Sequence, residues 1–195
     1  MEAKPSARDR LLAAANELFY NEGVHTVGVD RVVERAGVAK ASLYNTFGSK
    51  DELVRAYLDD RHAQTAARII RTLSRYDTPS ERLLGVFDVQ GELFAEPGFR
   101  GCAFVSACAE SPSEVAEAAA AGYRGWVREL FSGLAREAGV RDPEGLARRL
   151  HMVYDGASLA ASMDHDPAVA VAARAAAETL LDAAAAHPAD AEGHR

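Results

Sequence analysis

Apolar residues recur every three or four positions along most of the chain, which is the spacing expected of helices that bury one face. Tyr123, Trp126, Leu130 and Leu134 form one such run. No segment combines strict apolar–polar alternation with a hairpin turn, so the pattern gives no support to a β-sheet. We therefore predict an all-α fold of about nine helices. The predicted helices span residues 8–22, 29–36, 40–47, 50–74, 79–95, 103–110, 112–138, 143–163 and 167–186.

Capping signals place several of the helix starts. Residues 78–81 read Thr-Pro-Ser-Glu, which combines the hydroxyl and the Glu of a capping box with a Pro at the first helical position. Residues 111–114 repeat this arrangement, and residues 49–52 have the box without the Pro. Asp followed by Pro at 142–143 and at 166–167 pairs a cap with a Pro in the same way. A helix is expected to begin at each of these places.

The segment AGVAKASLYNTFGSK, residues 36–50, places a Gly between two short predicted helices. Gly37 can adopt the left-handed backbone conformation that ends a helix, and the next predicted helix begins three residues later. This spacing is typical of a helix-turn-helix. A catalytic loop, a turn between packed helices and a surface that reads another polymer are all compatible with so short a segment.

Predicted helix 40–47 has one apolar side and one small, hydrogen-bonding side. At about 100° per residue, Leu43 and Phe47 fall on the same side and are expected to face inward. The opposite arc holds Ala41, Ser42, Asn45 and Thr46, and one flank of the apolar pair holds Lys40 and Tyr44. Small polar side chains can enter a DNA groove, and a cation or a phenol can contact phosphates. A solvent-exposed helix after an ordinary turn has the same pattern, so both interpretations stay open at this point.

Charge is unevenly distributed along the chain. The 195 residues have a net charge of −7, which argues against indiscriminate binding to nucleic acid. Residues 1–62, however, carry nine Lys or Arg and ten Asp or Glu, so this part is nearly neutral and can approach a polyanion. The sequence shows no signal peptide and no apolar run long enough to span a bilayer. We expect a soluble cytoplasmic protein with no membrane partner.

Residues 8–58 resemble the tetracycline-repressor (TetR) family of bacterial transcription regulators. The shared features are an amphipathic first helix that ends in Phe and Gly, the helix-turn-helix, and the motif AGVxxxxLYxxFxxKxxL. The resemblance implies a helix-turn-helix DNA-binding domain over residues 1–49 and a helical ligand-binding and dimerisation domain over residues 50–195. GCAFVSACAE at 101–110 is similar to a segment of some members. Predicted helix 50–74 is about 36 Å long, which suits a lever between the two domains.

The resemblance also implies a set of DNA contacts. Small and hydroxyl positions that meet bases or backbone match Ala41 and Ser42, and the phosphate-contacting aromatic matches Tyr44. A variable position near base edges matches Asn45. Lys50 matches a Lys at the start of the fourth helix, where the helix dipole and the ammonium together favour a phosphate. With the flanking cation, the expected DNA-binding residues are Thr26, Lys40, Ala41, Ser42, Tyr44, Asn45 and Lys50.

The chain departs from the family at two places in this region. Many members have Thr where this chain has Val27 and Gly28, and we expect Thr26 to supply the missing helix cap and phosphate contact. Many members also have Gly where this chain has Ala41. The operator sequence of another member therefore does not transfer to this chain.

Specific binding by short helices requires a pair of them, about 34 Å apart on a two-fold DNA site. The last two predicted helices are rich in small residues, which allow helices to approach closely. Packing within one chain accounts for this composition equally well, and the resemblance favours a homodimer. The expected interface residues are Gly156, Ala157, Ala160, Ala161, Ala173, Ala177 and Leu181.

The middle helices hold most of the remaining large apolar residues. Aromatic residues at helical spacing are usually core, but the resemblance implies a cavity there for a small-molecule effector. Its expected lining is Phe87, Gln90, Phe94, Phe104, Cys108, Tyr123, Trp126, His151 and Tyr154. Cys102 and Cys108 can be buried thiols or redox sensors, of which the first is the commoner case.

Catalysis has little support in the sequence. HExxH, GxSxG, GxGxxG, a phosphate-binding loop and paired CxxC motifs are all missing. His151 and Asp155 are four residues apart and suit a pocket or core pair, and Asp-His-Asp at 164–166 suits a loop before a helix cap. We expect no metal, no cofactor and no enzyme. The expected function is a homodimeric repressor that reads a palindromic double-stranded DNA operator and is released by an effector. The alternatives are a helical ligand-binding or interaction module that never binds DNA and, last, a small helical enzyme.

Overall fold

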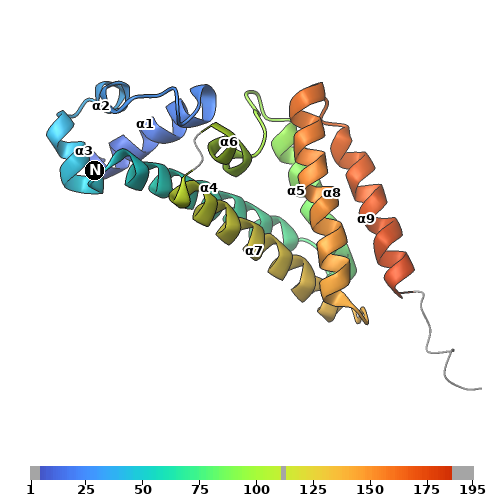
Figure 1. Ribbon diagram of the computed structural model, residues 1–195. Coiled ribbons are helices and arrows are strands. Elements are labelled where there is room, and N and C mark those ends of the chain that lie inside the picture. The colour runs from blue at the N-terminus through green and yellow to red at the C-terminus, as the bar shows by residue number, and fades with distance from the viewer. Residues whose placement is uncertain (1–4, 111–112, 186–195) are drawn as a thin grey trace, which may run out of the picture. The chain divides into compact units, whose positions relative to one another are not determined.

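The computed structural model describes residues 5–110 and 113–185, and within them nine helices and no strand are present (Figure 1). The helices are α1 (Ala7–Glu22), α2 (Val29–Ala36), α3 (Lys40–Phe47), α4 (Lys50–Leu73), α5 (Pro79–Phe94), α6 (Ala103–Glu110), α7 (Glu114–Glu137), α8 (Pro143–Asp164) and α9 (Val169–Ala185). The predicted all-α fold is confirmed. Each helix begins and ends within two residues of its expected bounds.

Side-chain caps account for two of these starts as expected. The Thr78 hydroxyl accepts the N–H of Glu81 at 3.2 Å, and the Glu81 carboxylate accepts the N–H of Thr78 at 3.0 Å. Pro79 occupies the first turn of α5. At the start of α8, the Asp142 carboxylate accepts the N–H of Gly145 at 2.9 Å. Such caps each contribute about 1 kcal/mol to helix stability.

Two other caps differ from the expectation. Ser49 accepts the N–H of Glu52 at 3.1 Å, but the Glu52 carboxylate pairs with Arg55, so only half of this capping box forms. A complete box that the sequence analysis missed stands at the start of α1. There the Ser6 hydroxyl accepts the N–H of Asp9 at 3.2 Å, and the Asp9 carboxylate accepts the N–H of Ser6 at 3.2 Å.

The starts of α7 and α9 lie slightly later than predicted. Residues 111–112 of the expected box lie outside the described residues, and the Ser113 hydroxyl accepts the N–H of Ala116 at 3.2 Å. The Asp166 carboxylate accepts the N–H of Ala168 at 2.8 Å, which closes a turn just before α9. Asp166 therefore shapes the loop and does not cap the helix itself.

The chain forms two compact units. The first consists of α1 to α3, α4 up to residue 66, α6, and α7 up to residue 123. The second consists of the rest of α4 and α7 together with α5, α8 and α9. Both α4 and α7 thus contribute to each unit. The functional boundary at residue 49 remains a prediction.

The core of the first unit is built from one apolar stripe on each helix. Leu11 of α1, Val32 of α2, Leu43 of α3 and Leu58 of α4 are all fully buried. Burial of each such side chain contributes about 1.5–3 kcal/mol. Leu43 is the main anchor of α3, which has no other fully buried side chain.

In the second unit α5 packs against α8 and α9. Phe87 of α5 contacts the rings of Phe131 and Tyr154, with centroids 5.7 and 6.4 Å away. A Cβ at Gly91 would stand 3.2 Å from the Cβ of Ala170, so the missing side chain lets α5 and α9 approach closely. Figure 1 shows α8 and α9 as two neighbouring antiparallel helices, drawn in orange and red.

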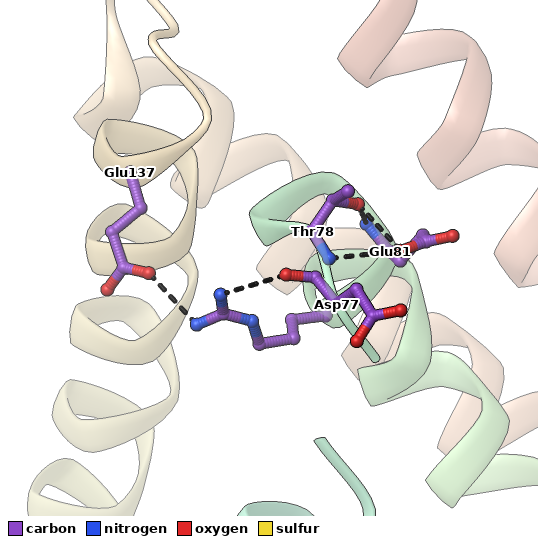
Figure 2. A network of polar contacts seen from close by, with 5 residues as sticks. Asp77, Thr78, Glu81 and Glu137 are labelled. Atoms are coloured by element: carbon purple, nitrogen blue, oxygen red, sulfur yellow. Dashed lines mark hydrogen bonds and ion pairs between the residues drawn. The ribbon is translucent and has the colours of Figure 1, made fainter. Parts of the chain in front are cut away.

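A surface network joins the start of α5 to the end of α7 (Figure 2). The Arg82 guanidinium donates to the Glu137 carboxylate at 3.2 Å and to the backbone carbonyl of Asp77 at 3.4 Å. The capping box of Thr78 and Glu81 lies beside this contact in Figure 2. The turn before α5 is thus held by one helix cap and one ion pair between helices.

Candidate nucleic-acid interface

The turn between α2 and α3 is the one that the sequence predicts. Gly37 has φ 62° and ψ 43°, the left-handed conformation, and its N–H donates to the Glu34 carbonyl at 3.1 Å. The Arg10 guanidinium of α1 donates to the carbonyls of Gly37 at 3.0 Å and Ala36 at 3.3 Å. These bonds satisfy carbonyls that the end of α2 leaves without helical partners. The turn is therefore fixed both by its own backbone and by α1.

α3 exposes the residues expected to read DNA. Ala41, Tyr44 and Asn45 are exposed and Ser42 is half-buried, while Leu43 is fully buried beneath them. Thr46 is exposed too, although its hydroxyl donates to the Ser42 carbonyl at 2.6 Å. We call Ala41, Ser42, Tyr44, Asn45 and Thr46 the recognition face. Its members are small or hydrogen-bonding, and the largest of them, Tyr44, is 45% exposed.

Phe47 was expected to face the core, but it is only partly buried. Its ring is half-buried, and the Arg8 guanidinium lies over it, 5.7 Å from the centroid. Phe47 is the last residue of α3, at the edge of the core, where few apolar side chains are available to cover its ring. The guanidinium of Arg8 covers the ring in place of an apolar side chain and makes a cation–π contact with it.

The other residues expected to contact phosphates are Lys40, Lys50 and Thr26. Lys40 is exposed at the first residue of α3 and pairs with the Asp30 carboxylate of α2 at 2.7 Å. Lys50 is half-buried at the first residue of α4. Thr26 is exposed, but α2 is capped by Gly28 without a side-chain hydrogen bond. The expectation that Thr26 replaces the missing cap is therefore wrong, and its phosphate contact remains a prediction.

The comparisons with known proteins agree with this geometry. The family model for bacterial regulatory proteins of the tetR family matches residues 11–57, which contain α2 and α3. The solved TetR-family transcriptional regulator SCO4454 from Streptomyces coelicolor is 33% identical, with a TM-score of 0.85 over 91% of this chain and 95% of that one. A solved TetR-type regulator from Streptomyces avermitilis, sav143, is 36% identical, with a TM-score of 0.83 over 94% and 100% of the two chains.

The chain belongs to the TetR family. Among characterised relatives, the transcriptional activator FasR of Mycolicibacterium smegmatis is 40% identical over 77 residues, which are 40% of this chain and 35% of FasR. The transcriptional repressor KstR2 of the same organism is 33% identical over 82 residues, 42% of this chain and 40% of KstR2. The chain thus spans well under half the length of these relatives. One of them activates and the other represses, so their names do not set the direction of regulation here.

The effector-site residues expected of a TetR-family member fall into both units. Phe104, Cys108 and Tyr123 belong to the first unit, and the other six belong to the second: Phe87, Gln90, Phe94, Trp126, His151 and Tyr154. In the first unit the Phe104 and Tyr123 rings stack with centroids 4.2 Å apart, and the His62 ring meets Tyr123 edge-on at 5.4 Å. Whether any of these side chains contacts an effector remains a prediction.

Gln90 and His151 are the buried polar side chains of this set. The Gln90 amide donates to the backbone carbonyl of Tyr154 at 2.9 Å and to the Ser158 hydroxyl at 3.0 Å. Its carbonyl oxygen and the His151 Nε2 are buried without a hydrogen-bond partner among the described residues. A buried polar atom without a hydrogen-bond partner lowers the stability of the fold, and a ligand or a water can supply the missing bond.

The surroundings of His151 favour its neutral form. Burial lowers the pKa of His151, and Arg124 and Arg128 lower it further, while Asp155 acts against them. Asp155 lies 3.5 Å from the imidazole but is itself paired with Arg124 at 2.5 Å. The imidazole therefore resists protonation in the folded protein more than in the unfolded chain.

This predicts a loss of stability toward acid pH. Below about pH 6.5 the unfolded state takes up a proton at His151 more readily than the folded state, so the free energy of unfolding falls as pH falls. We expect His151→Gln to flatten this dependence in urea unfolding measured from about pH 7 to about pH 5. His25→Gln, at an exposed histidine, serves as the control. An unaltered pH profile in His151→Gln would contradict the assignment.

The structure gives Cys108 little thiolate character. Its side chain is half-buried, and burial together with the nearby Glu117 raises its pKa. Reactive cysteines have lowered pKa values and electropositive surroundings. Of the two interpretations of this cysteine, the geometry favours the inert thiol.

Five of the seven residues expected at the dimer interface are buried within one protomer. Ala157, Ala161, Ala173, Ala177 and Leu181 are buried in the second unit, in which α5, α8 and α9 pack on one another. This is the packing within one chain that the composition left open, and it makes these five side chains unavailable to a second copy. Gly156 is exposed and Ala160 is half-buried, so these two stay candidates.

Sequence reasoning missed three contacts around the interface. They are the ion pair of Asp30 with Lys40, the Arg10 bonds to the turn, and a link from Tyr20 to the segment before α6. The Tyr20 hydroxyl accepts the N–H of Arg100 at 3.0 Å and donates to the Gly101 carbonyl at 3.2 Å. All three join residues far apart in sequence or on different helices, and no local pattern marks them.

Proposed function

We propose that the chain is a homodimeric transcriptional repressor that binds a palindromic DNA operator through α3 and is released by a small-molecule effector. The observation that carries the proposal is the recognition face, exposed above a single buried Leu43 and framed by Lys40 and Lys50. Such a face can contact base edges in the major groove while the cations contact phosphates. Membership of the TetR family supports the same function. A DNA-binding regulator of this kind acts in the cytoplasm.

An exposed apolar stripe supports the proposed dimer. Met152, Leu159 and Met163 of α8 are 74%, 57% and 71% exposed, and Gly156 lies between them at the same helical spacing. Val171 of α9 is 72% exposed. We call these five residues the α8–α9 apolar face. Exposed apolar surface of this extent is typical of an interface, and a second copy would place the same face opposite it.

α4 and α6 are the proposed route from effector to DNA. α4 begins at Lys50 beside the recognition helix and ends in the second unit. α6 belongs to the first unit, in which Tyr20 donates to the Gly101 carbonyl of the segment before α6. A ligand that favours one arrangement of these helices changes the spacing of the two recognition helices. A coupling of about 1–3 kcal/mol would lower operator affinity about 5- to 150-fold.

The test is a titration of the protein with the DNA upstream of its own gene, at two salt concentrations. We expect tight binding to a short inverted repeat, weaker binding to unrelated duplex, and steep salt dependence of both. A transcription assay on the same promoter should show repression. Absence of binding to any duplex would support the helical module that does not bind DNA.

Two substitutions separate phosphate contacts from base contacts. Lys50→Ala should weaken binding to all sequences alike and reduce the salt slope by about 0.9, the value of one phosphate contact. Asn45→Ala should instead change the preference among operator variants by about 1–3 kcal/mol at one position. Fluorescence anisotropy with matched duplexes measures both effects. An unchanged salt slope in Lys50→Ala would argue against its phosphate contact.

A further inference from the structure

The first cation of the recognition helix is already occupied in the DNA-free protein. The Lys40 Nζ lies 2.7 Å from the Asp30 carboxylate, and both side chains are largely exposed, at 51% and 78%. The hydrogen bond and the charge of Asp30 raise the pKa of Lys40. Asp30 also lies in the first turn of α2, where the positive end of the helix favours a carboxylate.

The same carboxylate opposes a DNA phosphate in two ways. A phosphate that binds Lys40 competes with Asp30 for the same ammonium, so the Asp30 pair weakens the attraction that Lys40 offers to it. Asp30 would also stand close to that phosphate, and like charges repel. The recognition face itself carries no acidic side chain, so Asp30 is the carboxylate tied directly to α3.

From this geometry we propose that Asp30 restrains DNA binding by holding Lys40 in an ion pair with which a backbone phosphate must compete. The inference rests on the proposed DNA-binding function and adds a residue that sets its strength. Because the effect acts through a phosphate contact, it weakens operator and unrelated DNA alike. Asp30 thus sets the overall strength of DNA binding and leaves the ratio of operator to non-specific affinity unchanged.

The test is Asp30→Asn, which keeps the shape of the side chain and removes its charge. We expect binding about 3- to 10-fold tighter at about 0.1 M salt, for an operator and an unrelated duplex alike, with a salt slope steeper by up to about 0.9. In a Lys40→Ala background, Asp30→Asn should increase the DNA affinity much less. Thermal unfolding of each variant verifies the fold.

Glu17→Gln is the matched control. Glu17 pairs with Arg35 of α2 at the same 2.7 Å distance, so this change removes one negative charge from the same unit without freeing Lys40. An equal gain in Glu17→Gln would assign the effect to net charge and overturn the proposal. The proposal also fails if Asp30→Asn binds no better than the wild type, or if its full gain persists without Lys40.

A second readout does not need DNA. The chain has three lysines, Lys4, Lys40 and Lys50, so ¹³C-methylated lysine signals can be assigned with two substitutions. We expect the pKa of Lys40, which Asp30 raises, to fall in Asp30→Asn. A Lys40 signal that does not respond to Asp30→Asn would show that the pair is not formed in solution. A wild type that binds no duplex overturns the proposed function instead, and the restraint with it.

Discussion

Ala41→Asp is expected to abolish operator binding while the protein remains folded. Ala41 is exposed on the recognition face, so an added carboxylate disturbs no core packing. Against DNA, however, the carboxylate faces phosphates and base acceptors, and such a like-charge contact costs several kcal/mol. We expect affinity to fall by more than about 100-fold, which is about 2.7 kcal/mol. Fluorescence anisotropy measures the affinity, and circular dichroism measures the melting temperature.

Ala63→Asp is the matched control for this change. Ala63 is also exposed on a helix, but it lies 13 positions after Lys50 on α4, about 20 Å along its axis. The control should bind almost as well as the wild type. Equal losses in both variants would mean that the added charge acts at a distance, and unchanged binding in Ala41→Asp would remove α3 from the DNA interface.

Leu159→Arg is expected to convert the protein to a monomer. Leu159 lies in the middle of the α8–α9 apolar face and is 57% exposed, so the arginine leaves the isolated chain folded. In a two-fold interface the substitution occurs twice and buries two unpaired charges, which costs several kcal/mol. Since the two recognition helices then bind independently, operator affinity should fall by about 100-fold or more. Sedimentation at micromolar concentration measures the oligomeric state.

Ile70→Arg provides the comparison for this prediction. Ile70 is an exposed apolar residue of α4, 63% accessible, outside the α8–α9 apolar face. It should remain dimeric and bind DNA. A wild type that sediments as a monomer, or a Leu159→Arg protein that stays dimeric, would contradict the proposed interface.

The helices could be predicted because their signals are local. The capping box of Thr78 and Glu81, the Asp142 cap and the left-handed Gly37 each act within a few residues, and the structure contains all three. The exposed side of α3 could also be predicted, because Leu43 determines which side of this eight-residue helix faces the core. Local periodicity decides these features before any tertiary contact is known.

Other features depend on contacts that sequence does not encode locally. Ala157 and Ala177 are small enough for either a dimer interface or packing inside one chain. Their burial in the folded protomer indicates packing inside the chain. Phe47 was expected to be core, but it sits at the edge of the unit beneath Arg8. Asp30 and Lys40 lie on different helices, so their pairing depends on the turn between them.

The proposed function requires α3 to lie in the major groove. Methylation protection of guanine N7 tests this most directly, because that atom lies in the major groove. With the wild type bound to its upstream DNA, we predict two groups of protected guanines, about one helical turn or a near multiple apart. Ala41→Asp should give no protection. Bound DNA whose major-groove guanines all remain reactive would contradict the proposed function.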